Sequence, residues 1–168
     1  MSSFAECVLG CHAPLYRYAR SLCGEPAEAE ELLHETYKRA LAAKRKPVVT
    51  DAIEIRPWMF TIMRNAWLNE KRRRAQETSI DESAFVSPES VELTVSRKLL
   101  VSEVRTAVDS LPVLWREMIV MRDIEDLTYA EIAAVLECPI GTVMSRLARA
   151  RNALRQILMP PVTEVRRR

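Results

Sequence analysis

Apolar residues recur at helical spacing along most of this 168-residue chain. Leu15, Tyr18, Ala19 and Leu22 fall on one helical face, and the same period returns in the later apolar segments. The chain contains only three glycines, which is too few for the many tight turns of an all-β protein. The periodicity and the scarcity of glycine together predict an all-α fold.

The same scarcity excludes several classes of enzyme. Gly10, Gly24 and Gly141 lie far apart, so the chain has neither a GxGxxG motif nor a phosphate-binding P-loop. The two histidines, His12 and His34, belong to no Ser/His/Asp or metal-hydrolase pattern. No apolar run is long enough for membrane insertion, and no basic segment typical of a signal peptide precedes the first helix. We therefore expect a cytoplasmic protein that is not an enzyme and needs no cofactor.

Four cysteines form no C-x-x-C pair: Cys7, Cys11, Cys23 and Cys138. Reduced, partly buried thiols are the simplest expectation for such a set. A metal or thiol sensor built from Cys7, Cys11 and His12, with Cys23 or His34, is an alternative that stays open at this point. It is less favoured, because structural zinc sites usually show closer paired spacings.

Charge is distributed unevenly, although the net charge is only +2. Residues 44–74 carry nine basic and three acidic side chains, and residues 140–168 carry seven basic and one acidic. Residues 75–92 between these blocks contain five acidic side chains and no Lys or Arg. Two basic blocks separated by acidic stretches indicate two separate contacts with a polyanion.

The same shifts in composition divide the chain into parts. Pro26 is well placed to start one helix, and Arg56-Pro57 to open another. We expect two small helical domains joined by a flexible acidic linker. The expected parts are an N-terminal domain, the linker, a C-terminal domain and a basic tail, over residues 1–75, 76–98, 99–159 and 160–168.

The C-terminal domain contains the pattern of a helix-turn-helix. Thr128 and Glu131 have the spacing of a capping box, and a short turn at residues 137–140 precedes a helix that ends near Leu158. The second helix is expected to bury five apolar side chains: Val143, Leu147, Ala150, Leu154 and Ile157.

The opposite face of that second helix presents hydroxyls and guanidinium groups: Thr142, Ser145, Arg146 and Arg149. Such side chains contact phosphates and base edges in the DNA major groove. The alternative is an ordinary pair of antiparallel helices with a basic exposed face. Because the hydroxyls and arginines concentrate on one strip, the pattern favours DNA binding.

The first basic block combines aromatic residues with cations. Trp58, Phe60 and Trp67 lie on a helix that continues into four consecutive cations: Lys71, Arg72, Arg73 and Arg74. Rings can stack on unpaired bases while cations hold phosphates. Each ring taken singly is better explained as a core residue, whereas the basic run is better explained as a phosphate contact than as a solvated face.

Several strings resemble bacterial sigma factors of the extracytoplasmic function (ECF) type. The strings LTYAEIA at 127–133 and PIGTVMSRLARAR at 139–151, preceded by Leu111-Pro112 and Arg116-Glu117, are similar to their region 4 domain. Upstream, AEELLHETY at 29–37 resembles the region 2 helix that binds the polymerase clamp. The string PWMFTIMRN at 57–65, with the basic run, looks like the promoter-melting segment of the same family.

The resemblance implies a sigma factor that binds core RNA polymerase and promoter DNA. Five residues would dock on the β′ clamp helices: Glu30, Glu31, Leu33, His34 and Glu35. The loop from about Thr50 to Arg56, with Trp58, Arg64, Asn65 and the basic run, would bind the minus-10 element. Region 4 would contact the β flap and read the minus-35 element through the four residues named above, and the linker would thread through the polymerase cleft. An anti-sigma factor would hold the protein inactive.

The chain departs from the family pattern at a few positions. Glu31 and His34 stand where Asp and Gln are common, and Met144 stands where a basic residue is common. Glu137 stands where many relatives carry Gly, and a non-Gly residue at positive φ costs about 1 kcal/mol.

A free-standing DNA-binding regulator that uses only the helix-turn-helix remains an alternative, but it leaves the N-terminal motifs unexplained.

Overall fold

The computed structural model describes residues 3–48, 51–77 and 97–159. Within these ranges the secondary structure is helical throughout, which confirms the all-α prediction. None of the helices described is long and apolar enough to cross a membrane. The helices are α1 Phe4–Gly10, α2 His12–Leu22, α3 Pro26–Ala42, α4 Ala52–Glu77, α5 Arg97–Asp109, α6 Val113–Ile119, the π-helical turn η1 Val120–Ile124, α7 Tyr129–Leu136 and α8 Ile140–Leu158.

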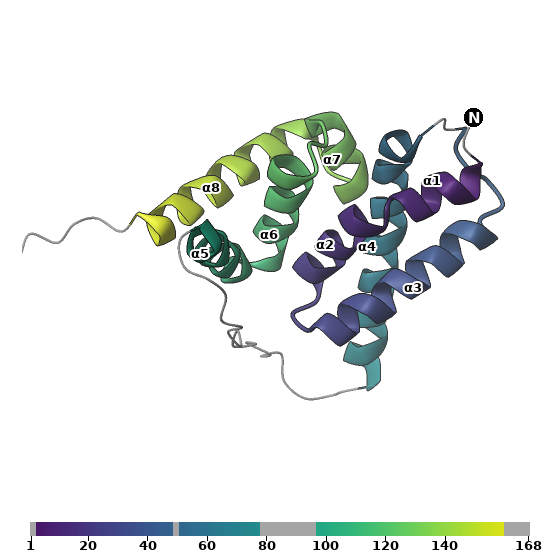
Figure 1. The fold of residues 1–168 in the computed structure, drawn as a ribbon, viewed down its shortest axis with the longest axis horizontal. Coiled ribbons are helices and arrows are strands. Elements are labelled where there is room, and N and C mark those ends of the chain that lie inside the picture. Colours follow the sequence, from purple (N-terminus) through teal and green to yellow (C-terminus); the bar gives the residue numbers. More distant parts are fainter. Residues whose placement is uncertain (1–2, 49–50, 78–96, 160–168) are drawn as a thin grey trace, which may run out of the picture.

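The N-terminal half is a bundle of α1 to α4, in which α3 packs along both α2 and α4 (Figure 1). Tyr18 and Phe60 stack in its core with ring centroids 4.6 Å apart, and both side chains are fully buried. Gly10 allows α1 to approach α4 closely, because a Cβ at this position would lie 2.9 Å from the Cβ of Ala52. The bundle fixes the orientation of α4 and of the polar side chains along it.

The start of α4 differs from the prediction. Pro26 is the first residue of α3, as expected, but α4 begins at Ala52 and contains Pro57 in its interior. The Asp51 carboxylate caps α4 by accepting hydrogen bonds from the backbone N–H groups of Ile53 and Glu54, at 2.7 and 2.9 Å. This cap starts the helix upstream of the proline, so the loop expected to reach Arg56 is helical from Ala52 onwards.

The C-terminal half packs α5, α6 and η1 against α7 and α8. Met118, Met121, Ile132, Val143 and Leu147 are buried at its centre. The prediction that α8 buries its apolar stripe to the end is wrong for Ile157, which is 47% exposed. The last turn of α8 lies beside α5 along a shallow groove, so its apolar side chains are only partly covered.

The two halves are in direct contact. Helix α4 packs against α7, and α2 packs against α6 and η1. Figure 1 shows α6 and α7 beside the bundle that contains α2 and α4. The predicted linker spans residues 76–98, and the basic tail spans residues 160–168. Of these, the structure describes only the helical ends at 76–77 and 97–98.

Three of the four cysteines are buried and Cys138 is half-buried. The Cys11 thiol donates a hydrogen bond to the Ala52 carbonyl over 3.0 Å. Burial raises the pKa of both Cys11 and Cys23 to about 11. In the ranges that the structure describes, no three His, Cys, Asp or Glu side chains converge to hold a metal ion, so the zinc interpretation has no site there.

Candidate nucleic-acid interface

Helix α7 and the turn after it set the direction of α8. The Thr128 hydroxyl accepts a hydrogen bond from the backbone N–H of Glu131 over 3.2 Å, and the Glu131 carboxylate accepts one from the N–H of Thr128 over 2.7 Å. This is the predicted capping box. At the other end of α7, Glu137 adopts a left-handed conformation with φ of 52°, the conformation that explains why many relatives carry Gly at this position.

Helix α8 has a buried side and an exposed side. Val143, Leu147 and Ala150 pack into the core of the C-terminal half. Ser145 and Arg149 are exposed on the other side. The exposed strip starts at the N-terminal end of the helix, where hydroxyl groups and backbone N–H groups are suited to phosphate and base contacts.

The other two predicted DNA contacts on α8, Thr142 and Arg146, are half-buried. Burial raises the pKa of Glu117 of α6, and the positive charge of Arg146 lies close enough to oppose part of that rise. Arg151 of α8 pairs with Asp123 of η1 through its guanidinium group. The exposed reading strip is therefore centred on Ser145 and Arg149.

Glu117 on α6 is fully buried against the N-terminal half. Its Oε2 accepts hydrogen bonds from the Arg64 Nε over 3.3 Å and from the Tyr18 hydroxyl over 3.1 Å. Burial raises the pKa of Glu117, and the charge of Arg64 opposes this effect. Arg64, which the sequence assigns to promoter binding, is thus held by a carboxylate of the other half.

Glu125 lies directly after η1 and is 1% exposed. Its carboxylate accepts hydrogen bonds from the Arg17 Nε over 2.5 Å and from the Arg17 Nη2 over 3.1 Å. The Arg56 Nη1 approaches the Glu125 Oε2 to 3.4 Å. A second predicted DNA contact, Arg56, is therefore also paired across the two halves.

The aromatic residues of α4 occupy different environments. Phe60 is fully buried against Tyr18, so it cannot stack on a base in this arrangement. Trp58 is half-buried and meets Phe4 edge-on with ring centroids 5.9 Å apart. Trp67 is half-buried with the Lys71 ammonium 4.8 Å from its ring centroid. Phe60 is therefore a core residue, and both tryptophans pack against the core with half-buried side chains.

The basic run at the end of α4 is exposed. Glu70 accepts hydrogen bonds from Arg73 and Arg74, which lower the pKa of Glu70 to about 2. Arg74 also bonds Glu28 of α3 over 2.8 Å. Part of this positive charge is therefore balanced within the chain, while Lys71 and Arg72 extend the exposed basic surface.

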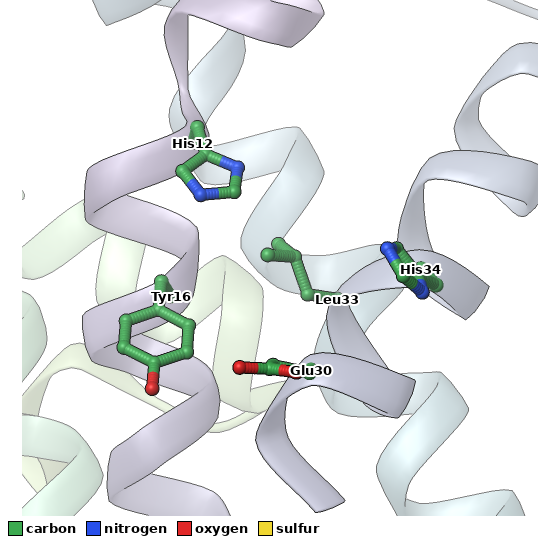
Figure 2. Close-up of a pocket in the computed structure, with 5 residues that line it drawn as sticks. All are labelled: His12, Tyr16, Glu30, Leu33 and His34. Carbon is green, nitrogen blue, oxygen red and sulfur yellow. The ribbon is translucent and has the colours of Figure 1, made fainter. Parts of the chain in front are cut away.

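The predicted polymerase-binding residues lie on α3. Glu30, Glu31 and His34 are exposed, and Glu35 bonds Lys38 and Arg39 of its own helix. Leu33 is buried, at 3% exposure. It lines a pocket of about 290 Å³ between α2 and α3. Figure 2 shows His12 and Tyr16 of α2 on one side of this pocket, and Glu30, Leu33 and His34 of α3 on the other.

Sequence reasoning missed Glu117 and Glu125 as functional candidates. Glu117 stands next to Met118 and Ile119 in a run where most neighbours are apolar. A carboxylate at a helical position within an apolar run is the signal that points to a buried ion pair. The sequence does not indicate which cations would approach it.

The chain matches two family models in the order predicted. The model described as sigma-70 region 2 matches residues 8–77, and the model described as sigma-70 region 4 matches residues 102–154. The ECF RNA polymerase sigma factor EcfG of Rhodopseudomonas palustris (strain TIE-1) is 30% identical over 156 residues, which cover 93% of this chain and 85% of that protein. The ECF RNA polymerase sigma factor SigE of Mycolicibacterium smegmatis is 32% identical over 166 residues, covering 94% of this chain and 62% of that protein.

Solved structures give the same result. The sigma factor RpoE of Bartonella quintana, crystallised with the anti-sigma factor NepR, is 30% identical with a TM-score of 0.70, covering 94% of this chain and 96% of that chain. CnrH, in complex with the cytosolic domain of CnrY, has a TM-score of 0.63 at 24% identity, covering 92% of this chain and 86% of that chain, and shares the fold. The chain therefore belongs to the ECF RNA polymerase sigma factors.

Proposed function

We propose that this chain binds core RNA polymerase and directs it to promoters with a minus-35 and a minus-10 element. Residues 1–75 would bind the polymerase clamp and the minus-10 element, and residues 99–159 would read the minus-35 element and contact the β flap. The observation that carries the proposal is the helix-turn-helix, which exposes Ser145 and Arg149 opposite the buried side of α8.

Arg149 is the side chain best placed for base readout. It is exposed on the strip that begins at the N-terminal end of α8, the end that enters the major groove in helix-turn-helix proteins. An arginine in this position makes bidentate hydrogen bonds to guanine. Ser145, one turn earlier, would contact a phosphate or a base edge, and Thr142 and Arg146 would flank them.

The minus-10 contact would use α4. Asn65 is exposed, Trp58 is half-buried, and the basic run from Lys71 to Arg74 continues along the same helix. Melting requires that a base leave the stack, which costs a few kcal/mol. A half-exposed ring and nearby cations can offset part of that cost by stacking and phosphate contacts.

The polymerase contact would use the exposed side of α3. Glu30, Glu31 and His34 present a polar and partly acidic surface beside the pocket that Leu33 lines. Acidic side chains in the first turns of a helix also interact favourably with the positive end of its dipole. These residues would therefore stabilise α3 and also contact the polymerase.

Binding to core polymerase tests this part of the proposal. The charge reversal Glu30→Lys with Glu31→Lys should weaken the complex at least tenfold in a titration with purified core polymerase. Glu54→Lys, a charge reversal at an exposed position of α4 outside the proposed polymerase-binding set, should leave the affinity unchanged. If both variants bind core polymerase as tightly as the unchanged chain, α3 is not part of the polymerase interface.

We further propose that an anti-sigma factor holds the chain inactive. Support comes from the two similar structures, which were each solved with a partner: RpoE with NepR and CnrH with CnrY. A tagged chain isolated from its host should bring down a protein that prevents binding to core polymerase. Free binding to polymerase under every growth condition, with no co-purifying inhibitor, would contradict this part.

A further inference from the structure

Most of helix α1 lies before residues 8–77, the part of the chain that matches the sigma-70 region 2 model, and none of its residues belongs to the proposed DNA-binding set. The helix is nevertheless well anchored. A capping box joins Ser3 to Glu6 at its start, and Cys7 and Val8 are buried. Figure 1 shows α1 against the N-terminal end of α4. Its contacts with α4 therefore decide what α1 does for the DNA-binding surface.

Helix α1 contacts the first two turns of α4 at both of its own ends. At the C-terminal end, Gly10 lies so close to Ala52 that a Cβ added to the glycine would come within 2.9 Å of the Ala52 Cβ. The Cys11 thiol, next in the chain, donates a hydrogen bond to the Ala52 carbonyl over 3.0 Å. At the N-terminal end, the Phe4 ring meets the Trp58 ring edge-on, with 5.9 Å between the centroids and 70° between the planes. Helix α1 thus supports the start of α4 and the Trp58 side chain on it.

The Phe4 ring also contacts a cation from the segment that precedes α4. The Lys46 ammonium lies 4.9 Å from the centroid of this ring, which is within the range of a cation–π contact. Lys46 is the last of three consecutive cations at residues 44–46, and all three are exposed. One ring of α1 therefore contacts both the Trp58 ring and a positive charge.

Trp58 lies at one end of a face of α4 that carries proposed minus-10 residues. Trp58, Asn65 and Arg72 recur every seven residues, which places them on the same face of the helix. Asn65 and Arg72 are exposed and Trp58 is half-buried. With a rise of 1.5 Å per residue, this face is about 21 Å long. The basic run lies at one end of the face, and Phe4 and Lys46 lie at the other.

We propose that Phe4 and Lys46 extend the single-stranded DNA site of α4 to the N-terminal end of that helix. Phe4 is a positioning residue that holds the Trp58 ring for stacking on an unpaired base, and Lys46 binds the adjacent phosphate. The inference rests on the proposed function, which assigns Trp58 to the minus-10 element.

The physical reason is preorganisation of the Trp58 ring and the Lys46 ammonium. A side chain that is already fixed loses less conformational freedom when it binds a ligand. The edge-on contact with Phe4 favours one orientation of the Trp58 ring. Stacking tolerates every base, and a lysine contacts phosphate as a point charge. The two side chains should therefore raise affinity for an unpaired strand without selecting its sequence.

The test measures binding of the full chain to a labelled, mixed-sequence single-stranded DNA by fluorescence anisotropy. Phe4→Ala and Lys46→Gln should each weaken this binding by about threefold or more. Each phosphate that a protein neutralises on a single strand contributes about 0.7 to the slope of log K against log salt. Lys46→Gln should therefore flatten that slope by about 0.7.

A double-mutant cycle separates positioning from simple packing. In a chain that already carries Trp58→Ala and Lys46→Gln, Phe4→Ala should cause no further loss of DNA affinity, because the groups that it positions are gone. A further loss as large as that in the unchanged chain would show that Phe4 does not act through them, and would overturn its positioning role.

Two control variants remove the same chemical groups elsewhere in the bundle. Tyr37→Ala removes a half-buried ring that stacks on His12, and Lys38→Gln removes an ammonium group from a side chain on α3 that is 77% exposed. Both controls should leave the DNA affinity unchanged. Losses in the controls equal to those in the test variants would overturn the inference. Lys46→Gln alters an exposed side chain, so it decides the question if Phe4→Ala loses its helical circular dichroism.

Phe4→Ala and Lys46→Gln variants that keep their helical content and bind DNA as tightly as the unchanged chain would overturn the inference. Promoter-specific initiation by the unchanged chain with core polymerase is measured in the same series. Initiation together with unaltered DNA binding by the variants rejects the inference and leaves the proposed function standing. Weaker DNA binding by the variants without initiation by the unchanged chain supports the extended site and rejects the proposed function.

Discussion

Arg149 is exposed on α8, whereas Arg56 and Arg64 are half-buried against glutamates of the other half. These three side chains carry the same charge, so charge alone does not distinguish their predicted roles. Their burial and their ion-pair partners do. An exposed arginine on a recognition helix is available for bases at once. A paired arginine must first lose its carboxylate, which makes its contribution depend on the state of the whole molecule.

Replacing Arg149 by alanine should reduce transcription from promoters with the preferred base at one minus-35 position. Removal of a bidentate hydrogen bond should cost about 1–3 kcal/mol and relax selectivity at that position. Transcription from a library randomised across the minus-35 element measures both effects. Arg155→Ala, at another exposed position on the same helix, is the matched control. An equal loss on every promoter would make Arg149 a phosphate contact only.

The buried thiols give a second prediction at this scale. Because burial raises the pKa of Cys11 and Cys23 to about 11, both remain protonated thiols at pH 8, and the thiolate is the reactive form. Iodoacetamide should therefore modify Cys138 before these two in the folded chain, and all four after unfolding in urea. Mass spectrometry of the peptides gives the rates. Modification of Cys11 or Cys23 at its unfolded rate in the native chain would contradict their placement.

At the scale of elements, local signals were the most reliable guide. The capping box from Thr128 to Glu131 follows from the spacing of neighbouring residues alone, whereas the left-handed residue Glu137 is indicated only by the glycine that many relatives carry there. Arg56-Pro57 favours a helix start at that point, but the Asp51 carboxylate caps α4 earlier, and the helix begins at Ala52. The end of α8 was misjudged because periodicity shows which face is apolar, and not whether another helix covers it.

Glycine at position 137 should stabilise the C-terminal half. Glu137 holds φ at 52°, where a side chain is strained and glycine is not, so Glu137→Gly should raise the free energy of unfolding by about 0.5–1 kcal/mol. Urea denaturation followed by circular dichroism measures the change. Glu137→Ala removes the same carboxylate and keeps the strain, so it should bring no such gain. If Glu137→Ala stabilises the chain and Glu137→Gly does not, the carboxylate charge, and not the backbone strain, limits the stability.

The basic run at the end of α4 gives a prediction about salt. Replacing Arg72, Arg73 and Arg74 with alanine should weaken DNA binding by the polymerase complex on all promoters. It should also flatten the dependence of log K on log salt by about 0.7–0.9 for each phosphate that the variant no longer neutralises. Because Arg73 and Arg74 already bond Glu70, Arg72→Ala alone should account for a large share. An unchanged slope would make the run a solvated face.

At the scale of the whole molecule, sequence reasoning predicted the order of the two units but not their contact. Charge blocks and helical periods report on each segment separately, so Glu117 and Glu125 read as ordinary acidic residues of the C-terminal half. Only the packing of α2 and α4 against α6 and α7 brings Arg17, Arg56 and Arg64 to them. Long-range pairing of this kind depends on which surfaces meet, and no local pattern encodes it.

The same packing changes how the predicted minus-10 residues are interpreted. Asn65 and the basic run are exposed, whereas Arg56 and Arg64 are half-buried and paired with glutamates of the C-terminal half.

The most direct measurement is transcription from a pool of genomic promoter fragments by core RNA polymerase with and without this chain. We predict start sites that appear only with the chain and share two upstream elements, one for α8 and one for α4. Mapping the start sites would identify both elements at once. Absence of chain-dependent initiation, together with tight DNA binding by the chain alone, would contradict the account and favour a free-standing DNA-binding regulator.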